Sequence, residues 1–517
     1  MTQKPLALLS VTDKTEITSF ARQLILLGYE IISTGGTATL LRQSEVECTE
    51  AGDYTQSPEI LNGRVKTLHP KIHGGILFDR NNPLHVKEAE SHAIRPIDLI
   101  VVNLYDFEKN AKGQNLDLPK AIEFIDIGGP TMLRAAAKNY LSTAPIIDPK
   151  DYETVISQLK EGGLKPEFRR QLAAKTFRTI SNYDSMIACY FEDSQAPTLT
   201  LTKIQDLRYG ENPHQKAVFY TAASSVKGGL QDATVLQGKE LSYNNLLDID
   251  SASNLVSDFP EYQAVAIIKH TNPCGMAIAS RGKEPLHKTY QRALEADSKS
   301  AFGGIVAFNA EVDGETALKL AETFLECIVA PKFSSEALAT LGKKKNLRLL
   351  ELPYLSSTTT AQKQYEIKSI TGGFLWQEKD GERLTKESLR LVTKTPVKDE
   401  DIDDLIFAQR VCKHVKSNAI VYARGGQTLA VGAGQMSRID SARFAAEKAK
   451  EFGHSLEGAV MASDAFFPFR DNVDTAAALG IKAIVQPGGS VRDEENIQAA
   501  DEHKIAMVFS GIRHFKH

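Results

Sequence analysis

The sequence predicts an α/β protein in two parts, and three observations support this prediction. With 517 residues the chain is too long for one ordinary hydrophobic core. Short apolar runs of strand length alternate with segments of helical period, which is the pattern of a sheet covered by helices on both faces. The stretch EDSQAPTLT at 192–200 has the composition of a linker. We therefore expect one domain over residues 1–198 and a second over residues 199–517.

The first part begins with the apolar run LALLSV, which predicts a buried strand. Asp13 and Glu16, three residues apart, form the pattern of a capping box that opens a helix, and Gly28 is expected to end that helix. YEIIST predicts a second strand, and Thr37 is expected to cap the helix that follows. Further on, DLIVVNLY predicts a strand, Pro130 opens an Ala-rich helix, and an amphipathic helix covers residues 168–187.

The second part contains strand-like segments separated by helical stretches such as DSARFAAEKAKEF, so it is also expected to be α/β, with two subunits of similar size. No convincing sequence repeat marks these subunits. The KKK run at 343–345 is expected on a solvated face. The strand-like segments are AVAIIK, GGIVAF, AIVYA, TLAVGAG, GAVMAS, KAIVQP and AMVFS.

The composition excludes several classes of function. The 61 Lys and Arg residues nearly balance the 65 Asp and Glu residues, so no general attraction to nucleic acid or to an anionic membrane is expected. No run of about 18 apolar residues predicts a membrane span. The five cysteines are scattered without a C-x-x-C pair, which favours a reducing compartment and a cytoplasmic location.

Polar residues follow the first two predicted strands, at the end of an open α/β sheet where ligands bind. Hydroxyls, glycines and an ammonium in such a place favour a phosphate at a helix N-terminus. Neither stretch matches the P-loop pattern, and for either alone ordinary turn and capping chemistry remains the alternative. The residues concerned are Ser10, Thr12 and Lys14 after the first strand, and Ser33, Thr34, Gly35, Gly36 and Thr37 after the second.

The segment GRVKTLHPKIHGG adds two cations. In an extended chain Arg64 and Lys66 lie on one side, where they repel each other unless an anion lies between them. A solvated basic edge remains the alternative. His69 and His73 have the spacing of helical metal ligands, but Pro70 and the glycines that follow make a continuous helix improbable, so no metal site is expected.

Several long motifs occur in a fixed order along nearly the whole chain. They are SVTDK, STGGTA, GRVKTLHP, NLYDF, IDIGGPTMLRAAAKN, LRYGENPHQ, AIIKHTNPCG, VGAGQMSR and SDAFFPFRDN. With this set the sequence closely resembles the bifunctional enzymes of late purine biosynthesis, which join an IMP cyclohydrolase to a transformylase of aminoimidazole carboxamide ribotide (AICAR). One departure is visible, because Asp106 stands where that family often has proline.

The resemblance implies a methylglyoxal-synthase-like domain with a parallel sheet, followed by a duplicated cytidine-deaminase-like α/β domain. True deaminases bind zinc through P-C-x-x-C, whereas Pro273-Cys274 has no second cysteine, so this domain is expected to lack zinc. The implied reactions are formyl transfer from 10-formyltetrahydrofolate to AICAR, which gives FAICAR, and dehydrative closure of FAICAR to IMP. Neither reaction requires a metal or a nicotinamide. A homodimer is implied by the family alone.

The chemistry of formyl transfer assigns roles within AIIKHTNPCG. The amine of AICAR is a weak nucleophile, and His270 suits the base that takes its proton. Lys269 supplies a cation for the oxyanion or a proton for the leaving folate nitrogen. Both follow an apolar strand, which Asn272-Pro273 is expected to break. Alone, His270 fits a hydrogen-bonded core residue as well, and Cys274 is assigned to packing.

Other positions match the family's transfer site. Arg208 fits a phosphate, and aromatic walls stack on flat rings. The apolar members fit an ordinary core equally well. The full set is Arg208, Tyr209, Asn245, Phe302, Glu326, Asn418, Arg438, Pro468, Phe469, Arg513 and His517.

Ring closure joins two groups of one molecule, so restraint of the substrate supplies much of the acceleration. By resemblance Lys66 polarises the formyl oxygen, while Tyr105, Asp126 and Lys138 manage protons. Lys138 sits in a helix, where lysines are usually surface residues. The phosphate is expected to be held by Arg64, Lys14, Thr37 and Thr67. The alternative function is a sensor or scaffold that binds purine ribotides without turning them over.

Overall fold

The computed structural model of the protein describes residues 4–61, 64–114, 116–192, 199, 201–222, 229–356 and 365–517. The chain divides into two compact units, Met1–Thr200 and Leu201–His517. The expected boundary after residue 198 and most of the linker-like stretch EDSQAPTLT lie outside the described residues. No helix in the described ranges is long and apolar enough to cross a membrane.

Unit 1 is built on a five-stranded sheet with the order β3-β2-β1-β4-β5, and all its neighbouring strands are parallel. Leu8 and Ile100 face a core formed with α4, α7 and α9, while Leu9 and Val101 face a second core formed with α1, α2 and α8. Alternate residues of the central strands β1 and β4 therefore fill opposite cores, as expected for a parallel sheet covered on both faces. The strands are β1 (Leu6–Ser10), β2 (Glu30–Ser33), β3 (Thr49–Glu50), β4 (Leu99–Val102) and β5 (Ala144–Ile146).

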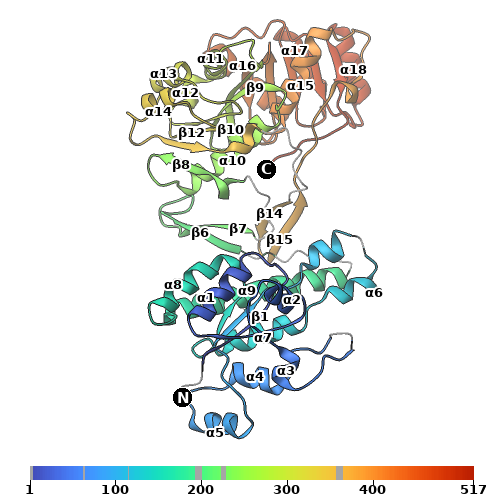
Figure 1. The fold of residues 1–517 in the computed structure, drawn as a ribbon. Coiled ribbons are helices and arrows are strands. Elements are labelled where there is room, and N and C mark those ends of the chain that lie inside the picture. The colour runs from blue at the N-terminus through green and yellow to red at the C-terminus, as the bar shows by residue number, and fades with distance from the viewer. Residues whose placement is uncertain are drawn as a thin grey trace. The chain divides into compact units, whose positions relative to one another are not determined.

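The helices of unit 1 lie around these strands (Figure 1). The predicted amphipathic helix at 168–187 is confirmed as part of α9, and Pro130 lies in the first turn of α7, also as predicted. The helices are α1 (Ile17–Leu26), α2 (Gly35–Gln43), α3 (Ala51–Thr55), α4 (Pro70–Leu77), α5 (Pro83–Ser91), α6 (Leu118–Ala121), α7 (Gly128–Lys138), α8 (Tyr152–Lys160) and α9 (Pro166–Phe191).

Two predicted helix caps are wrong. Glu16 precedes α1 with a left-handed φ of 55° and makes no side-chain cap, while Asp13 Oδ1 accepts hydrogen bonds from the backbone N–H and hydroxyl of Thr15. The hydrogen bonds between Asp13 and Thr15 form in place of a capping box, because such local bonds do not require helical geometry. Thr34, not Thr37, precedes α2, so Thr37 lies inside the first turn of that helix.

The expectation that Pro70 and the following glycines prevent a helix is also wrong. Pro70 is the first residue of α4, where a missing N–H costs nothing, and His69 Nδ1 caps the helix by accepting from Lys71 N at 3.1 Å. The glycines serve packing, since a Cβ on Gly75 would lie 2.5 Å from the Arg95 carbonyl oxygen.

Unit 2 contains one twelve-stranded sheet with the order β16-β21-β20-β19-β17-β18-β10-β9-β11-β12-β13-β8, together with two separate hairpins, β6-β7 and β14-β15. The seven predicted strand segments are confirmed as β9, β11 and β17–β21. The strands are β6 (Leu201–Leu207), β7 (Ala217–Ala222), β8 (Thr234–Gln237), β9 (Tyr262–Lys269), β10 (Asn272–Ser280), β11 (Ile305–Phe308), β12 (Cys327–Ala330), β13 (Arg348–Glu351), β14 (Tyr365–Ile370), β15 (Gly373–Glu378), β16 (Arg390–Leu391), β17 (Ile420–Arg424), β18 (Gln427–Gly432), β19 (Val460–Ser463), β20 (Ala483–Gln486) and β21 (Ala506–Phe509).

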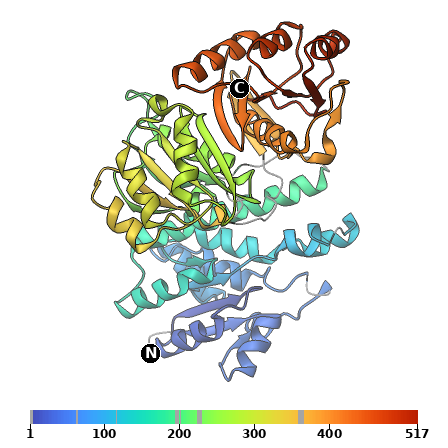
Figure 2. The same ribbon diagram turned by 90° about the horizontal axis from the view of Figure 1, so that it is seen from above.

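The sheet of unit 2 is a duplication. In the first half β9 and β10 form an antiparallel hairpin, β11 runs antiparallel to β9, and β12 and β13 follow in parallel. In the second half β17 to β21 repeat these relationships in the same order. The halves meet where β10 pairs with β18. Figure 2 shows them as a green-to-yellow group and an orange-to-red group.

The helices of unit 2 repeat as well. Helices α10 and α15 each precede a hairpin and share one core that spans both halves, while the opposite face of each half has a core of its own. The helices are α10 (Tyr243–Ser257), α11 (Leu286–Glu295), α12 (Ser298–Ala301), α13 (Gly314–Glu322), α14 (Ser335–Leu341), α15 (Asp399–Cys412), α16 (Arg438–Glu451), α17 (Asp471–Ala478) and α18 (Asp493–Glu502).

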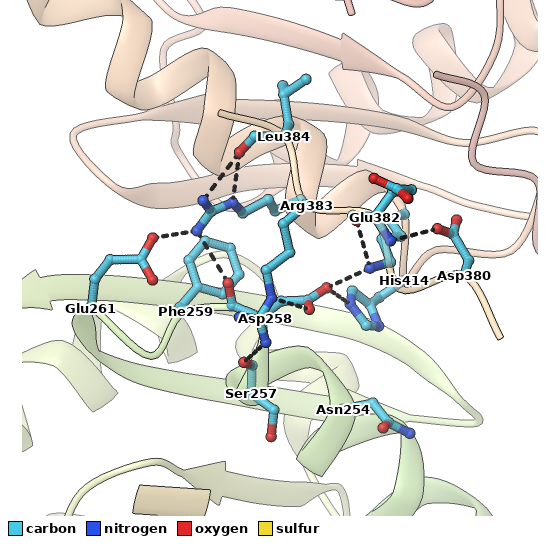
Figure 3. Close-up of polar contacts among 12 residues, drawn as sticks. Asn254, Ser257, Asp258, Phe259, Glu261, Asp380, Glu382, Arg383, Leu384 and His414 are labelled. Carbon is cyan, nitrogen blue, oxygen red and sulfur yellow. Dashed lines mark hydrogen bonds and ion pairs between the residues drawn. The ribbon is translucent and has the colours of Figure 1, made fainter. Parts of the chain in front are cut away.

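A buried ionic cluster joins the two halves (Figure 3). Asp258, at the end of α10, accepts a hydrogen bond from Lys413 Nζ at 3.0 Å and lies 2.7 Å from His414 Nε2, both at the end of α15. Arg383, from the segment between the halves, donates Nε to the other carboxylate oxygen at 3.2 Å. Burial alone would raise the pKa of Asp258, but the bond to His414 and the charges of His414 and Lys413 hold that pKa below its ordinary value.

Candidate functional site

The carboxyl ends of β1 and β2 bring hydroxyls and an ammonium together. Ser10 Oγ lies 2.7 Å from Thr34 Oγ1. Thr37 Oγ1 accepts hydrogen bonds from Val11 N at 3.0 Å and from Lys14 Nζ at 2.8 Å. The cation of Lys14 is thus held at the N-terminus of α2, where free N–H groups and the helix dipole favour an anion. Burial lowers the pKa of Lys14.

A cleft of about 520 Å³ opens beside this place. Ser33, Thr34, Gly35 and Lys66 line it, together with residues of α3 and the loop that follows. Lys66 Nζ lies 2.8 Å from Glu59 Oε1. It also lies close to Gly35, since a Cβ added to that glycine would be 3.6 Å from Lys66 Nζ. A Cβ on Gly36 would meet no described atom within 4 Å, so the N-terminus of α2 is open to a ligand.

Asn103, which follows β4, fixes the loop after β1 and was missed from the sequence. Its Oδ1 accepts from Thr12 N at 2.5 Å and from Asp13 N at 3.0 Å, and its Nδ2 donates to the Asp13 carbonyl at 3.2 Å. The backbone of Thr12 is therefore held in place by the Asn103 side chain. A side-chain amide that bonds only to backbone groups leaves no motif in the sequence that could have revealed it.

Thr67 and Asp126 meet at the N-terminus of α7. A Cβ on Gly128 would lie 2.9 Å from Thr67 Oγ1, and a Cβ on Gly129 would lie 2.5 Å from Asp126 Oδ2. The two glycines of IDIGGP are therefore required by close approach. Burial raises the pKa of Asp126, although hydrogen bonds from Gly129 and from the Tyr105 backbone oppose the rise.

The other predicted residues of unit 1 are more dispersed. Arg64 forms an ion pair with Glu123, and Tyr105 is exposed beside Asp126. Lys138 occupies the last turn of α7, whereas Asp126 precedes the first turn, so they lie at opposite ends of this helix. Within the described residues, no hydrogen bond or ion pair joins Lys138 to Asp126, Tyr105 or Lys66.

In unit 2 a cleft of about 1080 Å³ collects five predicted residues. They come from four places in the chain and are Arg208, Tyr209, Asn245, Phe302 and Glu326. The rings of Phe302 and Phe324 lie 5.1 Å apart and are 61% and 51% exposed, so they offer a flat apolar wall to the cleft.

Polar and charged groups surround this wall. Arg208 lies over the Tyr209 ring at 4.8 Å, and Glu326 Oε2 lies 2.8 Å from Arg348 Nη1. Lys343 and Lys345 are exposed, as predicted for the KKK run, and Lys344 and Lys345 also line the cleft. The cleft therefore offers cations for an anionic ligand as well as aromatic surface for a ring.

Lys269 lies at the edge of this cleft. Its Nζ donates to the Phe302 carbonyl at 2.8 Å. A Cβ added to Gly303 would lie 3.1 Å from the same Lys269 Nζ. Gly303 has a φ of 70°, so glycine is required there on both counts. His270 follows Lys269 directly and is exposed.

The apolar strand ends at Lys269, as expected, but Asn272-Pro273 does not break it, because both residues belong to the next strand. Strand β9 ends at Lys269, and β10 begins at Asn272, which pairs with Lys269. The strand tolerates Pro273 because the register shifts between Pro273 and Gly275, which leaves Cys274 as the extra residue of a bulge. Cys274 is a free thiol in an apolar core, and burial raises its pKa to about 12, in agreement with a packing role.

A second group of predicted residues lies in the second half of the sheet. Arg438 Nη2 donates to Asn418 Oδ1 at 2.9 Å and to Asp464 Oδ1 at 2.7 Å. Asp464 also accepts from Ser417 Oγ at 2.6 Å. Asp464 is fully buried and was not singled out from the sequence, although it lies in the motif SDAFFPFRDN. Arg438 thus joins Asn418 to Asp464, and Asp464 extends this network to Ser417.

The remaining predicted residues do not line either cleft described above. Phe469, which follows Pro468, is half exposed with the Arg492 guanidinium 4.8 Å from its ring. Arg513 lies 4.5 Å from the Phe515 ring. The backbone oxygen of His517 accepts a hydrogen bond from Lys368 Nζ at 2.9 Å, which attaches His517 to β14.

Comparison with known proteins identifies what the chain resembles. Residues 136–448 match the family described as AICARFT/IMPCHase bienzyme, and residues 16–131 match the MGS-like domain. The chain is 49% identical over 518 residues to the bifunctional purine biosynthesis protein PurH of Aquifex aeolicus, with 99% of this chain and 100% of that protein covered. It is also 49% identical over 522 residues to PurH of Persephonella marina, with 99% of each covered.

A solved structure, "Crystal structure of ForH", is 38% identical and covers 37% of this chain and 100% of its own, with a TM-score of 0.35. The MGS-like match ends inside α7, although β5, α8 and α9 belong to the same sheet and cores of unit 1.

Proposed function

The chain belongs to the AICARFT/IMPCHase bienzyme family, and from this premise we propose how its two activities divide between the two units. The chain carries AICAR formyltransferase and IMP cyclohydrolase activities, which are the last two steps of IMP biosynthesis, and the first of them uses a formyl-folate. We assign formyl transfer to unit 2 and ring closure to unit 1.

The observation that supports the first assignment is the cleft of unit 2. Arg208, Asn245 and Phe302 meet there although they are far apart in the sequence. Their chemistry fits a phosphorylated ribotide next to a flat pterin or imidazole ring, since a guanidinium binds phosphate and a phenyl ring stacks. The ammonium of Lys269 at the cleft edge supports the same assignment, because the reacting carbonyl needs a cation nearby.

In formyl transfer the amine of AICAR attacks the formyl carbon and must lose a proton as the C–N bond forms. The imidazole of His270 takes that proton, and Lys269 stabilises the oxyanion or protonates the folate nitrogen as it leaves. Asn418, Arg438, Pro468, Phe469, Arg513 and His517 are proposed to complete the binding of the two substrates.

Ring closure in unit 1 is supported by the cleft next to α2. The N-terminus of α2 and the cation of Lys14 suit the phosphate of FAICAR. Arg64, which pairs with Glu123 in this structure, is proposed to supply a second cation. Lys66 is proposed to polarise the formyl oxygen while the carboxamide nitrogen attacks. The raised pKa of Asp126 suits a group that exchanges protons near Tyr105, and Lys138 is proposed to assist in the loss of water.

Three finer proposals accompany this assignment. The formyl donor is 10-formyltetrahydrofolate, the protein is a homodimer, and it works in the cytoplasm. The exposed apolar side chains of the β14-β15 hairpin support a partner surface, and the wide scatter of the cysteines along the sequence, without a C-x-x-C pair, supports a reducing compartment. The alternative of a ribotide-binding sensor is not favoured, because the relatives are named as biosynthetic enzymes.

Two fragments test the division. A fragment of residues 1–200 is expected to convert supplied FAICAR to IMP, and a fragment of residues 201–517 is expected to formylate AICAR. Circular dichroism of each fragment serves as the control for folding. A folded fragment 1–200 that leaves FAICAR unchanged would contradict the assignment of ring closure to unit 1.

A further inference from the structure

The turn between β9 and β10 has an unusual backbone. Lys269 pairs with Asn272, so His270 and Thr271 form a two-residue hairpin connection. Their φ angles are 51° and 61°, which places both in the left-handed region. Hairpin turns of this kind normally carry glycine, asparagine or aspartate, because a β-branched or bulky side chain is strained there. The strain at a proposed catalytic histidine indicates that the surrounding structure holds the turn in place.

The duplicated half of unit 2 contains the same turn without this strain. Gly425 and Gly426 connect β17 to β18, where Arg424 pairs with Gln427. Their φ angles of 60° and 64° lie in the same left-handed region as those of the first turn, and glycine adopts them freely. The second half therefore shows how the turn is built where none of its residues is assigned a role in the reaction.

An aspartate supports each turn from the same position of the preceding helix. Asp248 is the sixth residue of α10, and its Oδ1 accepts from Thr271 N at 2.6 Å. Asp404 is the sixth residue of α15, and its two oxygens accept from Gly425 N at 2.9 Å and from Gly426 N at 2.8 Å. The brace is thus part of the duplicated fold, and only the residues of the turn differ.

We propose that Asp248 is a positioning residue for formyl transfer, which holds the strained His270–Thr271 turn so that His270 and Lys269 address the cleft. This inference rests on the roles proposed above for those two residues. Without the acceptor oxygen, the N–H of Thr271 loses its partner, and the turn is free to relax towards conformations that a histidine and a threonine prefer.

Two further contacts support this role. Asn245 lies one turn before Asp248 on the same face of α10 and lines the cleft, so one helix carries both a cleft residue and the brace. Asn272 holds the other side of the turn, since its Nδ2 donates to the His270 carbonyl at 3.2 Å and its Oδ1 accepts from Lys416 N at 3.0 Å.

The effects on the pKa of Asp248 agree with a carboxylate that lies close to the turn. Burial raises the pKa of Asp248, while the hydrogen bond from Thr271 and the charge of His270 oppose the rise. The carboxylate is half-buried beneath the turn and points to its backbone.

The duplication supplies a matched control for the experiment. Asp248→Ala and Asp404→Ala remove the same kind of brace from two equivalent turns of the full-length protein. We expect Asp248→Ala to lower kcat of formyl transfer by about 10- to 100-fold with little change in KM for AICAR, because misplaced catalytic groups cost rate more than binding. Asp404→Ala is expected to keep kcat within about threefold even though both variants lose thermal stability. Equal losses of kcat in the two variants would overturn the proposal.

Two rescue variants separate positioning from a general structural role. Asp248→Asn keeps an acceptor oxygen for Thr271 N and is expected to retain most of the wild-type kcat. Adding Thr271→Gly to Asp248→Ala relieves the left-handed strain and is expected to recover at least about fivefold of the lost kcat. A double variant as slow as Asp248→Ala, or an Asp248→Asn variant as slow as Asp248→Ala, would contradict the proposal. These two rescue variants also test the proposal if the control variant Asp404→Ala does not fold.

Ring closure of supplied FAICAR and the variant His270→Ala complete the design. Normal ring closure shows that each variant protein is folded in unit 1. If His270→Ala retains formyl transfer, the proposed role of His270 fails. If His270→Ala is inactive while Asp248→Ala is fully active, the positioning role of Asp248 alone fails.

Discussion

Lys413 Nζ lies 3.0 Å from Asp258 Oδ2, and both side chains are buried where the two halves of unit 2 meet. Removing one partner of a buried ion pair leaves the other charge without compensation, which typically costs about 3–5 kcal/mol. We therefore expect Asp258→Asn to lower the free energy of unfolding of unit 2 by about that amount. Urea denaturation measures it. The matched control is Asp399→Asn, which breaks an exposed pair with Lys386 and is expected to cost under about 1 kcal/mol.

The same cluster predicts how stability depends on pH. The pKa of Asp258 is lower in the folded protein than in the unfolded chain, so its contribution is complete above the unfolded value of about 3.9 and is lost as the pH falls below it. Burial also lowers the pKa of His414, so its contribution is complete above about 6.5 and declines as the pH falls below that value. Unfolding curves between pH 8 and pH 3 check both windows. A difference between wild type and Asp258→Asn that stays constant below pH 4 would contradict this account.

Thr37→Val tests the phosphate site of unit 1. Valine keeps the shape of threonine but removes the hydroxyl that joins α2 to Val11 and Lys14 in the loop after β1. We expect KM for FAICAR in ring closure to rise about tenfold, because a hydrogen bond to a charged group is lost, while formyl transfer is unchanged. Thr39→Val is the control, since the Thr39 hydroxyl donates only to the Gly35 carbonyl among the described groups. Equal KM values in the two variants would remove Thr37 from the site.

Phe302→Ala tests the aromatic wall of the cleft in unit 2. Loss of a stacking ring is expected to raise KM for the formyl-folate or for AICAR about tenfold, and Phe302→Tyr is expected to restore the wild-type value. Steady-state kinetics with each substrate varied in turn gives both constants. Unchanged constants in Phe302→Ala would mean that the ring contacts neither substrate.

The sequence predicted most of the strands that are buried on both faces, because an uninterrupted apolar run such as AVAIIK has few alternatives. The short buried strands β5, β12 and β13 were missed. Strand β10 escaped prediction because Pro273 and Gly275 are poor strand residues, and only the bulge at Cys274 makes them compatible with the sheet. The hairpins β6-β7 and β14-β15 are largely exposed on both faces, so they carry no alternating pattern to detect. Strand β10 and the two exposed hairpins therefore depend on tertiary contacts that the sequence does not display.

The candidate sites show the same limit. Local polarity at the ends of the first two strands predicted that Ser10, Thr34 and Lys14 belong together, because parallel strands end at one edge of a sheet. No spacing in the sequence joins Arg208 to Phe302 in one cleft, and only the resemblance to a family placed them in one site. The braces made by Asn103 and Asp248 bond to backbone N–H groups, which no motif records.

The most direct test of the central claim follows FAICAR and IMP separately in two folded variants supplied with AICAR and formyl-folate. The account predicts that His270→Ala makes no FAICAR but converts added FAICAR to IMP at the wild-type rate, and that Lys66→Ala accumulates FAICAR. Formation of FAICAR at the wild-type rate by His270→Ala, or loss of both reactions in either variant, would contradict two separate sites.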